Sequence, residues 1–154
     1  MRSLVAGLLV VLVVSLASVA GQWGIGISSE PLDIAGGGFF VDSFVDLPIP
    51  VLRQVADLSM RPSFGFGPLP INPQILFLDL PVVMGVSLGE MNAYIGMGPS
   101  FMMTTNLSWT DIDALVIGGI DSIRITDRIT IYIELKVRGA GFFMSPGVGF
   151  VFDF

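Results

Sequence analysis

The residues of this chain that could do chemistry are carboxylates and a smaller number of cations. Histidine and cysteine are absent, so the usual general base, the usual transition-metal ligands and the thiol nucleophile are missing. The acidic candidates are Asp42, Asp46, Asp79, Asp121, Glu134 and Asp153, and the basic candidates are Arg61, Arg124, Arg128, Lys136 and Arg138. Carboxylates alone can catalyse, but cations in comparable number favour mutual neutralisation.

We therefore expect no enzymatic activity, no cofactor and no metal site. The expected role of these charges is to form ion pairs inside the protein. The candidates for those pairs are Arg61, Asp79, Arg124, Glu134, Lys136, Arg138 and Asp153. A path for ions along the same charges is the alternative interpretation.

Several of the charges recur at every second position, which is the spacing of one face of a β-strand. From residue 128 to residue 138, one face holds Ile129, Ile131, Ile133, Leu135 and Val137. The opposite face holds Arg128, Thr130, Tyr132, Glu134, Lys136 and Arg138. This stretch predicts a strand with one aliphatic and one charged face.

The same two-faced pattern predicts further strands over residues 58–66, 76–88, 93–103 and 147–154, and less regular ones over 23–28, 39–47 and 113–126. In the stretch 113–126, a β-bulge near Asp121-Ser122 restores the alternation by adding one unpaired residue. Pro62, Pro81 and Pro99 fall inside predicted strands. Each proline removes a ladder donor, so we expect all three at bulges or rims.

The composition is unusual for a protein with a water-facing surface. Hydrophobic residues make up 53% of the chain and charged residues 13%, whereas a soluble surface carries about 25–35% charged residues. After the first 20 residues, no stretch is long and apolar enough for a membrane helix. Membrane strands of about 9–11 residues alternate apolar and polar side chains, so they contain no long apolar run. The net charge of −6 gives no electrostatic footprint for nucleic acid.

The first 20 residues have the pattern of a secretory signal peptide. A short basic start at Arg2 precedes an apolar run over residues 4–16, and small residues follow up to Ala20. This order predicts cleavage after Ala20. An uncleaved anchor helix is the alternative, but it needs about 20 apolar residues. The predicted division is a signal peptide over 1–20 and one barrel domain over 21–154.

These patterns together predict an all-β fold, an eight-stranded antiparallel up-and-down transmembrane β-barrel. The polar faces are rich in glycine and serine and poor in lysine, which suits the crowded interior of a small barrel. The apolar faces would then meet lipid. A soluble barrel of the lipocalin kind, or a sandwich, would turn the same apolar faces inward instead.

Three short motifs resemble the small bacterial outer-membrane β-barrel superfamily that includes opacity-type and OmpA-like transmembrane domains. They are the run at 92–99, the Gly118-Gly119 pair leading into residues 123–128, and the terminal run at 147–154. The resemblance implies that Phe150, Phe152 and Phe154 form the signal read by the barrel-assembly machinery.

The expected function is that of a non-enzymatic integral protein of the Gram-negative outer membrane, with a structural or envelope-interaction role. Its expected partners are outer-membrane lipid and, during biogenesis, the barrel-assembly machinery, with no nucleic acid. A narrow, porin-like channel for small solutes or ions is one alternative, and a soluble secreted binding protein is the second. The sequence leaves the oligomeric state open.

Overall fold

The structure, a computed structural model, describes residues 21–30, 38–49, 57–69, 75–89, 91–104, 109–139 and 143–153. Apart from short turns and breaks, these residues form strands. The strands are β1 (Gln22–Glu30), β2 (Gly38–Pro48), β3 (Asp57–Met60), β4 (Ser63–Leu69), β5 (Ile75–Asp79), β6 (Val82–Leu88), β7 (Met91–Thr104), β8 (Trp109–Thr126), β9 (Ile129–Arg138) and β10 (Phe143–Asp153). The expected signal peptide, residues 1–20, and Phe154 lie outside the described residues. Among the described residues, no helix is long and apolar enough to cross a membrane.

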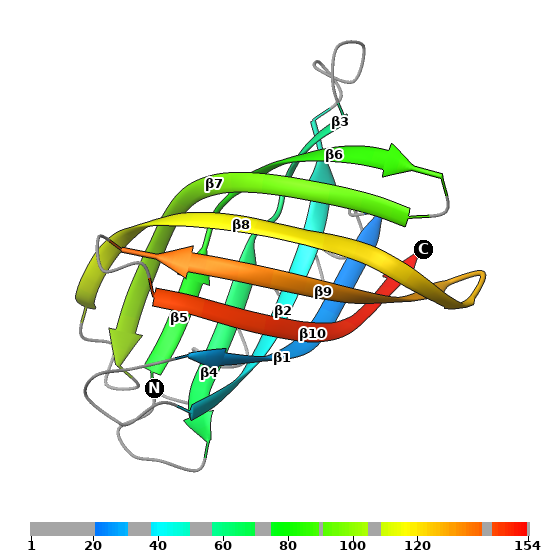
Figure 1. The fold of residues 1–154 in the computed structure, drawn as a ribbon. Coiled ribbons are helices and arrows are strands. Elements are labelled where there is room, and N and C mark those ends of the chain that lie inside the picture. Colours follow the sequence, from blue (N-terminus) through cyan, green and yellow to red (C-terminus); the bar gives the residue numbers. More distant parts are fainter. Residues whose placement is uncertain are drawn as a thin grey trace.

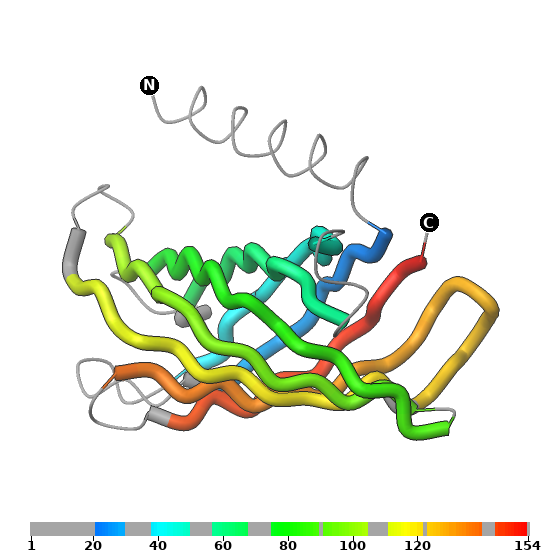
Figure 2. Tube along the Cα trace, turned by 90° about the horizontal axis from the view of Figure 1, so that it is seen from above, coloured from blue at the N-terminus to red at the C-terminus, as the bar shows by residue number. Residues whose placement is uncertain are grey.

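The strands close into one antiparallel barrel (Figures 1 and 2). Each barrel strand pairs with its neighbours in sequence, and β1 pairs with both β2 and β10, which closes the sheet. β3 and β4 together form one barrel strand, and so do β5 and β6, so the barrel has eight strands. The predicted all-β, eight-stranded antiparallel fold is confirmed.

Prolines cause the two interruptions. Pro62 separates β3 from β4, and Pro81 separates β5 from β6. The register is the same on both sides of each break: Ser63 pairs with Asp79, and Met60 pairs with Val82. Each proline still accepts a hydrogen bond of the ladder. The Val45 amide donates to the Pro62 carbonyl oxygen at 3.1 Å, and the Arg61 amide donates to the Pro81 carbonyl oxygen at 3.0 Å.

Pro99 lies within β7, opposite the second of these breaks. Its carbonyl oxygen accepts a hydrogen bond from the Leu80 amide at 3.0 Å, but its nitrogen cannot return one. The expectation that all three prolines lie at bulges or rims is wrong for Pro62 and Pro81, which interrupt their strands without shifting the register. Pro99 instead sits in a regular part of β7, paired with Ala114, and its missing donor faces the Leu80-Pro81 interruption.

The predicted bulge in β8 is confirmed. The register with β9 shifts between Asp121, which pairs with Tyr132, and Ile123, which pairs with Ile131. The extra residue is Ser122. Because of this shift, Asp121 is buried while Ile123 and Ile125 are exposed on the outer face.

The barrel carries its apolar side chains outside and its charges inside. Along β9, Ile133 and Leu135 are 50% and 42% exposed, whereas Glu134, Lys136 and Arg138 are buried. Large exposed apolar side chains follow the outer faces of the other strands as well; among them are Val82, Met84, Val86, Ile95, Met97, Val148 and Phe150. The predicted assignment of the two faces is therefore confirmed.

Candidate functional site

The charged residues of the interior meet in one connected cluster, which we call the ion network. It consists of Asp42, Asp46, Arg61, Asp79, Glu134, Lys136 and Arg138. β9 contributes its three consecutive inward positions, Glu134, Lys136 and Arg138, because side chains alternate along a strand. β2 contributes Asp42 and Asp46, and β5 contributes Asp79.

Arg61 lies at one end of the network, at the break between β3 and β4. Its Nη2 is 2.6 Å from Asp46 Oδ2, and its Nε donates to both carboxylate oxygens at 3.1 Å. The guanidinium lies between two aromatic rings, 4.0 Å from the centre of Tyr94 and 4.4 Å from that of Phe44. Arginine suits this position because its planar group can bind a carboxylate with two donors and stack on rings.

Lys136 lies at the centre and links the carboxylates. Its Nζ is 3.5 Å from Asp42, 3.5 Å from Asp79 and 3.7 Å from Glu134. Glu134 in turn lies 3.7 Å from Arg61 Nη1 and accepts a hydrogen bond from the Tyr94 hydroxyl at 2.9 Å. Opposite charges thus alternate along the barrel interior.

Arg138 lies at the other end of the network and binds Asp79. Its Nη2 is 2.6 Å from Asp79 Oδ2, and its Nε donates to Ser100 Oγ at 3.2 Å. The Asp79 carboxylate also accepts hydrogen bonds from Ser100 at 2.6 Å and from Ser63 at 3.1 Å. Asp79 is only 1% exposed, and its four partners compensate for the loss of water.

Glycines make room for the large inward side chains on the adjacent strand. Gly119 pairs directly with Tyr94, and a Cβ added there would collide with the Tyr94 hydroxyl. Gly149 is likewise paired with Tyr132. A Cβ at Gly65 would lie 2.6 Å from Asp42 Oδ1. Glycine is therefore what lets the aromatic rings and carboxylates of this narrow interior fit together.

The structure places five of the seven predicted ion-pair residues in the network: Arg61, Asp79, Glu134, Lys136 and Arg138. The prediction that Arg124 belongs to the interior ion pairs is wrong, because its side chain is exposed. β8 and β9 continue past the barrel rim as a projecting hairpin, seen in Figure 1, and both Arg124 and Arg128 lie on it. Asp153 is half-buried near the chain's C-terminal end, where it accepts a hydrogen bond from Gln22 Nε2 at 2.7 Å.

The sequence reasoning gave no role to the neutral partners of the charges. Tyr94, Ser63, Ser100 and Phe44 bind or cover charged groups, although none of them was a candidate. The sequence did contain a signal for two of them. Tyr94 and Ser100 alternate with the outward apolar residues of β7 and therefore lie on its inner face. Of the aromatic residues assigned to the assembly signal, Phe150 is exposed on the outer face and Phe152 stacks on Trp23 with ring centres 5.2 Å apart.

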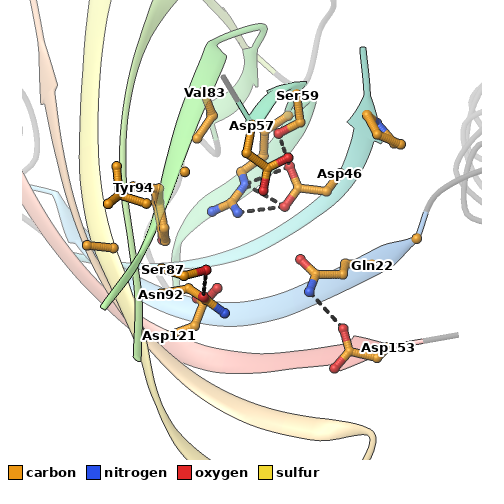
Figure 3. A pocket seen from close by; sticks show the side chains of 16 residues that line it. Gln22, Asp46, Asp57, Ser59, Val83, Ser87, Asn92, Tyr94, Asp121 and Asp153 are labelled. Atoms are coloured by element: carbon orange, nitrogen blue, oxygen red, sulfur yellow. Dashed lines mark hydrogen bonds and ion pairs between the residues drawn. The ribbon is translucent and has the colours of Figure 1, made fainter. Parts of the chain in front are cut away.

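A cavity of about 470 Å³ opens at the barrel end where β1 starts and β10 stops. We call it the vestibule; Figure 3 shows its side chains. Arg61 of the ion network and Tyr94, which contacts the network, form part of the lining of the vestibule. Four carboxylates also line it: Asp46, Asp57, Asp121 and Asp153. The apolar part of its inner lining comes from Val83 and the Tyr94 ring, because Val86 and Ala93 lie on the outer faces of their strands.

Comparison with known proteins identifies the fold alone. No family model matches the chain, and no curated protein matches it. Among solved structures, the chain resembles a de novo designed transmembrane β-barrel, TMB2.3, determined by solution NMR. The TM-score is 0.54 at 7% sequence identity, and the match covers 87% of this chain and 94% of that one. The fold is therefore that of a small antiparallel barrel of the transmembrane kind.

Proposed function

We propose that the protein is an integral outer-membrane β-barrel with a structural or envelope-interaction role and no enzymatic activity. The observation that carries the proposal is the combination of an exposed apolar outer face and charges paired inside the barrel. In a bilayer, every backbone polar group needs a partner within the protein, and a closed sheet supplies one. Lipid then solvates the exposed apolar side chains of the outer face, which water solvates poorly.

Export and assembly follow from the sequence motifs. The signal-peptide pattern over residues 1–20 would direct the chain across the inner membrane, and cleavage after Ala20 would leave the barrel over 21–154. The resemblance to opacity-type and OmpA-like barrels supports assembly by the barrel-assembly machinery through Phe150, Phe152 and Phe154. The partners we propose are this machinery and outer-membrane lipid.

A soluble secreted barrel is less consistent with the exposed residues. Ile95 and Met97 of β7 are 56% and 69% exposed, and similar side chains surround the barrel. Contiguous apolar surface of this extent promotes aggregation in water. The outer face therefore supports lipid as the surrounding medium.

The test is envelope fractionation of a Gram-negative host that expresses the full chain. We expect the protein in the outer-membrane fraction, with an electrophoretic mobility that changes after boiling because the folded barrel resists detergent. Recovery in the soluble periplasmic or extracellular fraction would contradict the proposal. It would mean that the apolar faces are covered in another way.

A further inference from the structure

The vestibule has more negative charge than the ion network can neutralise. Among the described lining residues, Arg61 has the single cationic side chain, and its guanidinium is already bound to Asp46 at 2.6 Å. Cleavage after Ala20 would add the α-ammonium group of Gly21, and the carboxylates of the described lining would still outnumber these cations. Asp57, Asp121 and Asp153 also line the cavity. Carboxylates at one cavity mouth raise the local concentration of cations.

Asp121 is the carboxylate most in need of a partner. It is only 8% exposed, and its Oδ1 is buried without a hydrogen-bond partner among the described residues. The bulge at Ser122 fixes its position, because Asp121 is the last inward residue of β8 before the register shifts. A buried carboxylate oxygen without a donor is unfavourable. A ligand that supplies an N–H donor would remove that cost.

The arrangement of the lining points to an extended organic cation rather than a metal ion. No group of three carboxylates in the described part of the chain lies close enough to hold a metal. The acidic residues instead come from four different strands around the cavity, β2, β3, β8 and β10. Val83 and the Tyr94 ring offer apolar contact between them. The volume of about 470 Å³ is that of a small-molecule site.

We propose that the vestibule binds a small aliphatic cation with two ammonium groups, and that Asp121 is its principal anchor. One ammonium group pairs with the Asp121 carboxylate, and the second reaches another carboxylate of the rim. The methylene chain between them packs on Val83 and the Tyr94 ring. This inference goes beyond the structural role proposed above, which needs no ligand.

The probe for the test is 1,5-diaminopentane, titrated calorimetrically into the full chain purified in detergent. We expect saturable binding at one site per barrel, and no binding of the neutral analogue 1,5-pentanediol. Added salt should weaken the binding because it screens charge. The Asp121→Asn variant should bind about tenfold more weakly, which corresponds to about 1.4 kcal/mol.

The matched control is Asp127→Asn, which removes the same charge from the exposed turn between β8 and β9, outside the vestibule lining. It should bind like the unaltered protein. A heat-modifiable band verifies that each variant is folded and separates failure of this proposal from failure of the proposed function. If Asp121→Asn does not fold, Asp57→Asn replaces it, because Asp57 lines the vestibule but is exposed; a several-fold loss is expected.

Four results would overturn the proposal. The first is the absence of saturable diamine binding to the unaltered protein. The second is equal affinity of the folded Asp121→Asn and Asp127→Asn variants. The third is equal binding of diamine and diol, which would show that charge does not select the ligand. Tight binding of Ca²⁺ alone, without competition from the diamine, would also overturn it in favour of a metal site.

Discussion

Among the interior carboxylates in the described part of the chain, Asp79 has the most charged and polar partners. Arg138 and Lys136 lie 2.6 and 3.5 Å from its oxygens, and Ser63 and Ser100 donate to it. Breaking a buried pair is costly mainly because the remaining charge loses its partner. Without Asp79, Arg138 would lose the carboxylate that it binds and Lys136 one of its three.

We expect Asp79→Asn to lower the free energy of unfolding by about 3–5 kcal/mol, since the amide keeps the shape but removes the carboxylate that Arg138 binds and one of the three carboxylates around Lys136. Urea unfolding in detergent micelles, followed by tryptophan fluorescence, measures the change. The control is Asp111→Asn at an exposed carboxylate of β8, which should change stability by less than about 0.5 kcal/mol. Similar stabilities of the two variants would show that the network is not stabilising.

Gly118 and Gly119 test the crowding of the interior at adjacent positions of one strand. A Cβ at Gly119 would meet the Tyr94 hydroxyl and lie 2.6 Å from the Ile133 carbonyl oxygen. A Cβ at Gly118 would meet only the Tyr94 carbonyl oxygen at 3.8 Å, an ordinary contact.

Gly119→Ala should therefore destabilise the barrel by about 1–3 kcal/mol through overpacking. Gly118→Ala should be neutral, or slightly stabilising because it restricts the unfolded chain. The two variants share chemistry and sequence context, so the difference between their urea midpoints isolates the inward contact. Equal midpoints would contradict the assigned faces of β8.

At the scale of elements, β9 shows most directly how one strand serves two media. Its outward Ile133 is 50% exposed, and its inward neighbours Glu134 and Tyr132 are buried. The outer face needs only hydrophobicity, whereas each inner position has specific partners. Substitutions on the two faces should therefore differ in their effects.

Ile133→Arg places a charge on the outer face of β9. If that face meets lipid near the bilayer midplane, the cost is about 2–4 kcal/mol. Thr130→Ser, on the opposite face, should be nearly silent. Folding yields into lipid vesicles compare the two variants with the unaltered chain. Equal yields for Ile133→Arg and Thr130→Ser would contradict the face assignment.

At the scale of the whole molecule, side chains fill the middle of the barrel. The ion network crosses it, and Phe40, Phe44, Phe77, Tyr94 and Tyr132 are all buried there. An eight-stranded barrel has an interior just wide enough for side chains. Arg61 and Tyr94, which line the vestibule, are themselves buried.

We expect no conductance steps when the purified protein is incorporated into planar lipid bilayers, because charged and aromatic side chains occlude the barrel. Heat-denatured protein in the same detergent controls for leakage caused by the detergent. Reproducible steps from the folded protein alone would contradict this expectation and favour the narrow-channel alternative.

Much of the fold could be predicted because strand faces follow from local alternation. The bulge at Asp121-Ser122 was predictable for the same reason, since strict alternation would otherwise have placed Asp121 with Ile123 and Ile125. Pro62 and Pro81 were expected at bulges or rims because proline lacks a ladder donor, but each interrupts a strand without a register shift, since its carbonyl oxygen still accepts a ladder hydrogen bond. Arg124 was misassigned because alternation gives the face of a residue but not its height along the barrel, and β8 and β9 extend past the rim.

The sequence by itself determined which residues face inward, because that choice depends only on the period of two along each strand. Only the tertiary structure decided which inward residues meet. Arg61 binds Asp46, and Arg138 binds Asp79 across 59 positions of sequence, because closure and strand stagger set their relative heights. The vestibule and the unpaired oxygen of Asp121 have the same origin, since they depend on what all the strands leave unfilled at one end.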